Sequence, residues 1–108
     1  MAIFTVTIPD GAPGAGLSNS ANIGGGLIAA VHIPTGSENA TFGFDYSPDG
    51  GTTWDPVNDE SATPLVITYL AGGALHQINP PIRAPYCRLY GVSNVEADTS
   101  LVCEIHTV

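Results

Sequence analysis

The sequence predicts an all-β protein: a single-domain antiparallel β-sandwich of jelly-roll or immunoglobulin-like topology with about eight strands. Short runs in which apolar and polar residues alternate recur along the 108 residues, as in strands with one buried face. Gly, Pro, Asn and Asp bound these runs, and no window of helical length has apolar residues spaced three and four apart. The length suits one domain, over residues 1–108, with one core.

The expected strands follow from the alternation and from its interruptions. In chain order they are 3–8, 27–33, 41–46, a short piece around 53–57, 65–70, 74–78, 86–91 and 99–107. Since successive side chains of a strand point to opposite faces, four of these strands each present one apolar set to the core. The residues expected to face inward are Phe4, Val6, Ile8, Phe42, Phe44, Tyr46, Leu65, Ile67, Tyr69, Leu101, Cys103 and Ile105.

Two stretches do not fit the alternation and are expected to be long loops. The first, about 9–26, is a Gly/Ser-rich N-terminal loop, and the second, 79–85, contains Pro80, Pro81 and Pro85. Long loops on a rigid sandwich are frequent binding elements. We therefore expect partner contacts in these loops and at the apolar residues Leu17 and Ile23.

A turn motif lies between two apolar runs, in the sequence Ser47-Pro48-Asp49-Gly50-Gly51-Thr52-Thr53-Trp54. Pro48 presets the first turn position, Asp49 can accept hydrogen bonds from backbone amides, and the glycines allow positive φ, after which Trp54 folds back over the turn. We expect a structural hairpin formed by Ser47, Asp49, Gly51 and Trp54. The motif matches the Asp-box pattern of sialidases and other propeller proteins, but a single copy without internal repeats excludes a propeller.

The charge balance excludes two classes of partner. The sequence contains ten carboxylates, two arginines and no lysine, which gives a formal net charge of −8. A protein that binds nucleic acid or an anionic membrane needs a basic patch, which two arginines cannot form. No secretory leader or bilayer-length apolar run is expected either, so synthesis in a host cytoplasm is predicted.

No constellation of residues indicates an enzyme, a cofactor or a metal centre. The three histidines, His32, His76 and His106, are scattered, and no hydrolase elbow or metalloprotease motif occurs. Several carboxylates surround the hairpin, and a solvated acidic loop is favoured there over a structural cation. These carboxylates are Asp45, Asp49, Asp55, Asp59 and Glu60.

The two cysteines, Cys87 and Cys103, fall on the last two expected strands. If these strands form a hairpin symmetric about Val95, the thiols lie opposite each other, at a separation that some antiparallel pairs can bridge. Because a cytoplasmic product keeps its thiols reduced, buried free thiols are favoured over a disulfide.

The order of motifs resembles a family of small proteins encoded among the structural genes of tailed phages. The resemblance covers most of the chain and is carried by 27–34, 40–54, Ile78-Asn79-Pro80 and Tyr86-Cys87-Arg88-Leu89-Tyr90. Members of this family resemble capsid decoration, or cement, proteins. The resemblance implies a structural virion protein on the capsid surface whose partners are the major capsid protein and further copies of itself. A homotrimer is favoured and a dimer is the alternative.

A weaker likeness to discoidin-like and galactose-binding jelly rolls supports a competing function. Such a protein would be a carbohydrate-binding or host-adhesion module, with aromatic side chains stacked on sugar rings. The candidate stacking residues are Tyr46, Trp54, Tyr69, Tyr86 and Tyr90.

Overall fold

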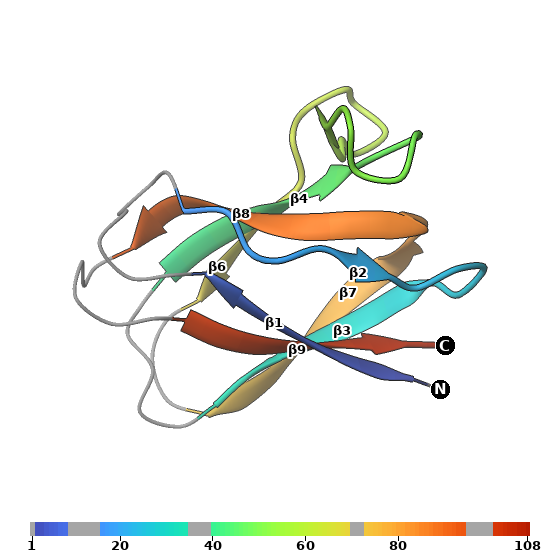
Figure 1. The fold of residues 1–108 in the computed structure, drawn as a ribbon. Helices are drawn as coiled ribbons and strands as arrows, with labels where there is room; N and C mark the ends of the chain where they lie inside the picture. The colour runs from blue at the N-terminus through green and yellow to red at the C-terminus, as the bar shows by residue number, and fades with distance from the viewer. Residues whose placement is uncertain (1, 9–15, 35–39, 70–72, 95–100) are drawn as a thin grey trace.

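The computed structural model describes residues 2–8, 16–34, 40–69, 73–94 and 101–108. Among them are nine strands arranged in two layers (Figure 1). One sheet has the order β1-β9-β3-β7, and the other has the order β2-β8-β4-β5, with β6 also paired to β4. The bounds are β1 (Ile3–Ile8), β2 (Ala21–Asn22), β3 (Ile28–Ile33), β4 (Ala40–Tyr46), β5 (Asp55–Pro56), β6 (Val66–Tyr69), β7 (Ala74–Ile82), β8 (Tyr86–Asn94) and β9 (Leu101–Thr107). The prediction of an all-β antiparallel sandwich is confirmed.

The pairing of the strands is that of a jelly roll. The first strand pairs with the last, β1 with β9, and the second with the second to last, β2 with β8. Inside these pairs, β3 pairs with β7 and β4 with β6. A long antiparallel ribbon wound into two sheets gives this nesting. Of the two topologies left open by the sequence, the jelly roll is therefore the observed one.

The strand bounds differ from those expected mainly inside the two predicted loops. β2 lies in the 9–26 stretch, where its two residues pair with Cys87 and Tyr86 of β8. β7 continues to Ile82 through a segment expected to be a loop, and it includes a cis Asn79-Pro80 bond. Because β7 is at the edge of its sheet, its prolines need not donate to a second neighbour. Its register with β3 shifts between Ile28 and Ala30 of β3.

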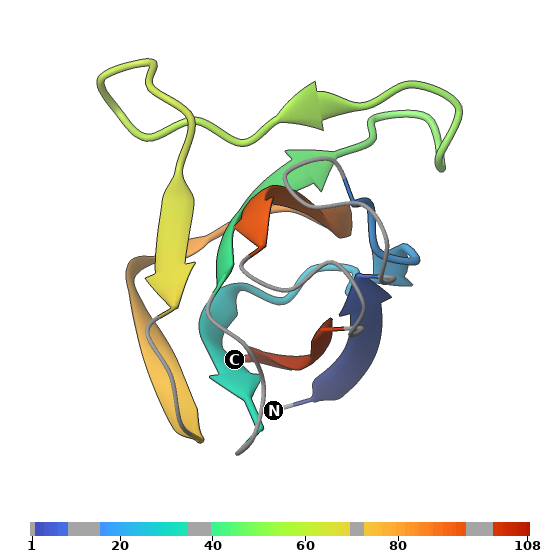
Figure 2. The same cartoon turned by 90° about the vertical axis from the view of Figure 1, so that its left-hand side faces the viewer.

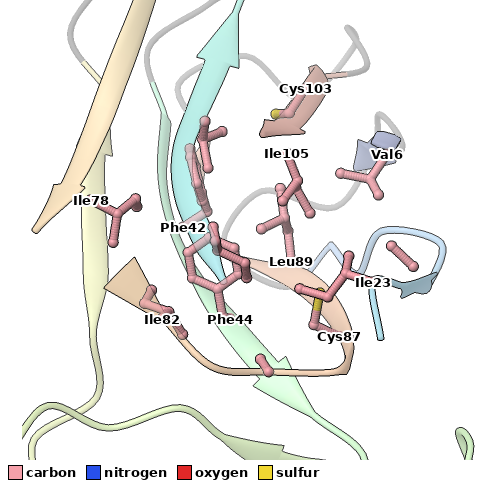
Figure 3. Packing of buried hydrophobic residues seen from close by; sticks show 14 of the residues in the cluster. Val6, Ile23, Phe42, Phe44, Ile78, Ile82, Cys87, Leu89, Cys103 and Ile105 are labelled. Carbon is pink, nitrogen blue, oxygen red and sulfur yellow. The ribbon is translucent and has the colours of Figure 1, made fainter. Parts of the chain in front are cut away.

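The core fills the space between the two layers (Figure 3). Phe42 and Phe44 of β4 are both fully buried, and their rings meet edge to face at a centroid distance of 6.5 Å. Of the residues expected to face inward, the buried ones are Val6, Ile8, Phe42, Phe44, Cys103 and Ile105. Phe4, Tyr46 and Leu65 pack against this cluster while staying partly exposed. Ile67, Tyr69 and Leu101 lie outside the side chains that the structure describes.

The predicted hairpin between the last two strands is wrong. β8 pairs with β2 and β4, whereas β9 pairs with β1 and β3, so Cys87 and Cys103 lie in opposite sheets. The chain crosses from one layer to the other after β8, as the jelly roll requires. Both cysteines are free thiols and are fully buried. Burial raises the pKa of Cys87 to about 11 and that of Cys103 to about 12.

This burial predicts how the thiols react. At pH 8 we expect a thiol reagent to leave both cysteines of the native protein unlabelled, because the thiolate is the reactive form and burial disfavours it. After denaturation without reductant both should be labelled, which mass spectrometry can count. Rapid labelling of the native protein would contradict the burial, and an unlabelled denatured chain would show a disulfide.

Candidate functional site

The turn between β4 and β5 is organised by two side chains. The Ser47 hydroxyl accepts a hydrogen bond from the Gly51 amide at 2.7 Å and donates one to Asp49 Oδ1 at 2.9 Å. Asp49 Oδ1 also accepts from the amides of Thr52 and Thr53, at 3.1 and 2.9 Å. Gly50 and Gly51 have φ values of 75° and 108°, which only glycine adopts readily. The motif therefore forms the expected hairpin, with Tyr46 opposite Asp55.

These bonds act on the charge state of Asp49. The amide and hydroxyl of Thr53, followed by the Ser47 hydroxyl, hold the pKa of the Asp49 carboxyl at about 2, below its ordinary 3.8. Donors to a carboxylate favour its ionised form. Because all of these donors lie within the turn, Asp49 is engaged in structure rather than directed toward a ligand.

Acid should therefore weaken the turn. A carboxyl whose pKa is lower in the folded state stabilises the fold above its unfolded pKa, and this contribution is lost as the pH falls from 3.8 towards 2. We expect the free energy of unfolding, measured with denaturant at several pH values, to decrease over this window. Asp49→Asn should remove the part of this pH dependence that is due to the Asp49 carboxyl. An unchanged pH dependence in the variant would contradict the assignment.

Trp54 lies over two side chains of β8 in the layer that carries the hairpin. Its ring centroid is 4.2 Å from Arg88 Cζ and 5.8 Å from the centroid of the Tyr86 ring. Its indole Nε1 donates to the Gly51 carbonyl at 3.2 Å, and Arg88 Nε donates to Asp45 Oδ2 at 3.0 Å. Trp54 is nevertheless only partly buried. Trp54, Tyr86 and Arg88 thus form a rigid ridge on the outer face of this sheet, called the aromatic ridge below.

Tyr90 continues the same row along β8. It lies opposite Gly43 of β4, and its ring occupies the space where a Gly43 side chain would be. A glycine at this position lets the aromatic ring cover the neighbouring strand. Burial, and then the charge of Asp45, raises the pKa of Tyr90.

The opposite layer presents a surface of different chemistry. On the outer face of the β1-β9-β3-β7 sheet, three aliphatic side chains remain exposed: Ile3 at 50%, Leu75 at 47% and Val102 at 41%. Among the described residues, Glu104 is the one carboxylate on this face. Its Oε1 lies 3.2 Å from both His32 Nδ1 and His106 Nε2. We call this surface the neutral face, because Glu104 is the one formally charged side chain among its described residues when histidine is counted as neutral. It comprises Ile3, Thr5, His32, Leu75, Gln77, Val102, Glu104 and His106.

Acidic groups are concentrated on the other side of the molecule. The remaining carboxylates among the described residues belong to β4, to β5 or to the segments that follow them. This part of the chain extends beyond the two sheets at the top of Figure 2. The described acids are Asp45, Asp49, Asp55, Asp59 and Glu60. With Arg83 and Arg88 on the same side, these five acids leave a formal charge of −3 there, against −1 from Glu104 on the neutral face, so the charge of the described residues is asymmetric between the two layers.

A groove of about 620 Å³ lies between β7 and the segment that connects β5 to β6. Its apolar lining comes from Val57, Leu65, Val66, Ile78 and Ile82. Polar side chains and prolines complete it: Asn58, Asp59, Glu60, Gln77, Asn79, Pro80, Pro81 and Arg83. The 79–85 stretch, expected to be a contact loop, thus contributes one wall of a groove and part of an edge strand.

The structure separates some residues that the sequence grouped together. Ser47, Asp49, Gly51 and Trp54 meet in the turn, and Trp54 meets Tyr86. Tyr46 packs against the core, away from a stacking role, and the Tyr69 side chain lies outside those described. Leu17 is exposed as expected, but Ile23 is a core residue, so its expected role as a surface contact is wrong. The neutral face was not predicted from the sequence. Its signal there is one apolar residue at an outward-facing position in each of three strands: Ile3 in β1, Leu75 in β7 and Val102 in β9.

The described residues also bear on metal binding and on membrane insertion. Among the described residues, no group of three or more His, Cys, Asp or Glu is placed to hold a metal ion. No helix in the described ranges is long and apolar enough to span a bilayer. A comparison with known protein families and with curated proteins finds no match for the chain.

Proposed function

We propose that the protein is a structural virion protein, a capsid decoration protein that binds the outside of a phage head and stabilises it. The observation that carries the proposal is the neutral face, where Ile3, Leu75 and Val102 stay exposed on the outer side of one sheet. The order of motifs resembles that of phage decoration proteins, and from this resemblance we infer that the partner is the major capsid protein.

The asymmetry of charge fits a protein that is bound on one side. Docking the neutral face buries aliphatic surface, which contributes roughly 25 cal/mol per Å² of apolar area. The acidic hairpin would then point away from the shell, where a net charge of −8 keeps unbound copies soluble. Many modest contacts repeated over a shell give strong overall attachment.

The test is binding to phage heads that lack the protein. Wild-type protein should saturate the heads at a fixed ratio to the major capsid protein and raise their resistance to heat. Val102→Asp should weaken binding at least about tenfold, because it places an unpaired charge in an apolar contact. The matched control is Val66→Asp, since Val66 has a similar exposure of 46% but belongs to the other sheet.

The outcomes separate the possible functions. Equal binding by both variants would show that the neutral face is not the contact surface. Absence of any binding to heads, together with capture of a defined sugar on a glycan array, would replace decoration by host adhesion. Thermal melting of both variants checks that each is folded.

A glycan-binding module is the second candidate function, supported by the aromatic ridge. Trp54 is partly exposed, while Arg88 and Tyr86 hold its ring in place. A rigid aromatic side chain with an apolar face and a polar edge is suited to stacking on a sugar. If a glycan binds, Trp54→Ala should abolish its capture and Val102→Asp should leave it unchanged.

A further inference from the structure

Strand β1 forms one edge of its sheet among the described strands, and the Asn19 side chain covers that edge at Thr7. It pairs only with β9 among the described strands and lies at the margin of the layer in Figure 2. Its sequence, Ile-Phe-Thr-Val-Thr-Ile, contains no charge and no proline, and its register with β9 is regular along all six residues. Exposed edges of this kind pair readily with another strand.

The backbone groups that would pair are those of Ile3 and Thr5 and the Thr7 carbonyl, because the Thr7 amide already donates to Asn19 Oδ1. The Thr107 amide donates to the Ala2 carbonyl, so even-numbered residues of β1 point their backbone groups toward β9. In an antiparallel ladder the alternate residues then point outward. The Thr7 amide shows this direction, since it donates away from β9 to Asn19 Oδ1 at 2.9 Å. Ile3 and Thr5 are exposed.

The other described edges are protected. β7, at the far side of the same sheet, contains Pro80 and Pro81 and a shift of register. In the second sheet, β2 and β5 have two residues each and β6 has four. Proline, irregular register and short length each discourage pairing between molecules. The contrast singles out β1.

We propose that two copies of the chain associate through β1, in an antiparallel pair that joins their two sheets into one. Symmetry about a two-fold axis requires each residue to meet its mirror position. With the axis at Thr5, Thr5 lies opposite the partner's Thr5, and Ile3 lies opposite the partner's Thr7. The outward N–H and C=O groups of Thr5 then bond to those of the partner's Thr5.

Side chains on both faces suit this pairing. Threonine opposite threonine is a favourable cross-strand pair, and both lie on the neutral face. On the inner face, Phe4 is partly exposed and would lie opposite the partner's Val6, so pairing removes more of the Phe4 ring from water. The two neutral faces become continuous, so pairing leaves them accessible to a third partner. The proposal does not depend on the capsid function.

Charge works against the pairing and gives it a distinctive salt dependence. Two copies of net charge −8 repel each other, while β1 itself carries no charge to offset this. The Debye length, over which charges repel each other, shortens from about 30 Å at 0.01 M salt to about 3 Å at 1 M. We therefore expect association to strengthen as salt is raised.

The test is the mass of the purified protein by sedimentation velocity. Wild type should move from 11.1 kDa towards twice that mass as its concentration rises towards about 1 mM. Thr5→Lys should lower the association constant at least about tenfold, because like charges then oppose each other at the axis. Within one copy the new lysine lies beside Glu104, its register partner on β9, so the fold should be kept.

Two further variants make the test specific. Thr5→Glu, which sets a second carboxylate beside Glu104 within its own copy and so costs some stability, should also be monomeric alone, whereas an equimolar mixture with Thr5→Lys should restore the dimer by pairing opposite charges. Gln77→Lys, the same charge change on the β7 edge, should dimerise like wild type. Thr5→Pro removes the outward N–H without adding charge and should likewise be monomeric. Circular dichroism melting checks that each variant is folded.

Three results would overturn the proposal: a wild-type protein that stays at 11.1 kDa throughout, a mixture that remains monomeric, or a Gln77→Lys variant that loses the dimer. None of these results concerns binding to heads. Failure of the pairing and failure of the decoration function are therefore distinguishable.

Discussion

Replacing Phe44 by Ala is expected to lower the free energy of unfolding by about 3–5 kcal/mol, the usual cost of truncating a buried aromatic residue. Phe44 is fully buried at the centre of the sandwich and packs edge to face on Phe42. The cavity cannot close easily, because both sheets contribute to its walls. A domain of this size is typically stable by only about 5–15 kcal/mol, so the variant should be close to unfolding at 37 °C.

Denaturant unfolding followed by circular dichroism measures this loss. Phe44→Leu is the matched control, and it should lose less stability because leucine fills much of the same volume. A loss below about 1 kcal/mol for Phe44→Ala would mean that the two layers do not pack as described.

Trp54→Ala is expected to cost about 2–3 kcal/mol, less than a fully buried tryptophan because part of the ring remains exposed. The variant loses the hydrogen bond to the Gly51 carbonyl and the contacts with Arg88 and Tyr86. Trp54→Phe separates these contributions. It keeps an aromatic ring over β8 and loses the hydrogen bond, which contributes about 1 kcal/mol. A cost under about 1 kcal/mol for Trp54→Ala would show that the ring is not fixed by β8.

Local sequence signals predicted the parts of the fold that depend on neighbouring residues. The bounds of β1 were predicted without error because its alternation is regular and a proline follows it in the sequence. The Ser47–Trp54 turn was predictable for the same reason: its hydrogen bonds, from Ser47 Oγ and Asp49 Oδ1, stay within the motif.

Features that depend on distant residues were not predictable in this way. β2 has two residues and exists because Ala21 meets Cys87 of β8. β7 continues past Pro80 because it is an edge strand, which the strand order decides and the local sequence does not. The crossing between layers after β8 separates Cys87 from Cys103, although a simple hairpin would have brought them together.

The neutral face illustrates the same limit for the candidate site. Ile3, Leu75 and Val102 belong to β1, β7 and β9, which are far apart along the chain. Each is an isolated apolar residue on the polar side of its own strand, which is unremarkable by itself. Only the strand order shows that they share one surface.

The pairing of β1 with β9 also constrains how the chain folds. The Ala2 carbonyl accepts a hydrogen bond from the Thr107 amide, and Ile3 pairs with His106. In Figure 1 the two ends of the chain lie side by side. During translation β1 therefore has no partner until the ribosome has released Leu101–Thr107. Closing so long a loop costs chain entropy before any contact compensates it, and topologies dominated by such distant pairings fold slowly, over milliseconds to seconds. Until then the uncharged β1 segment is exposed in the nascent protein, where it is open to pairing with other strands and to binding by chaperones.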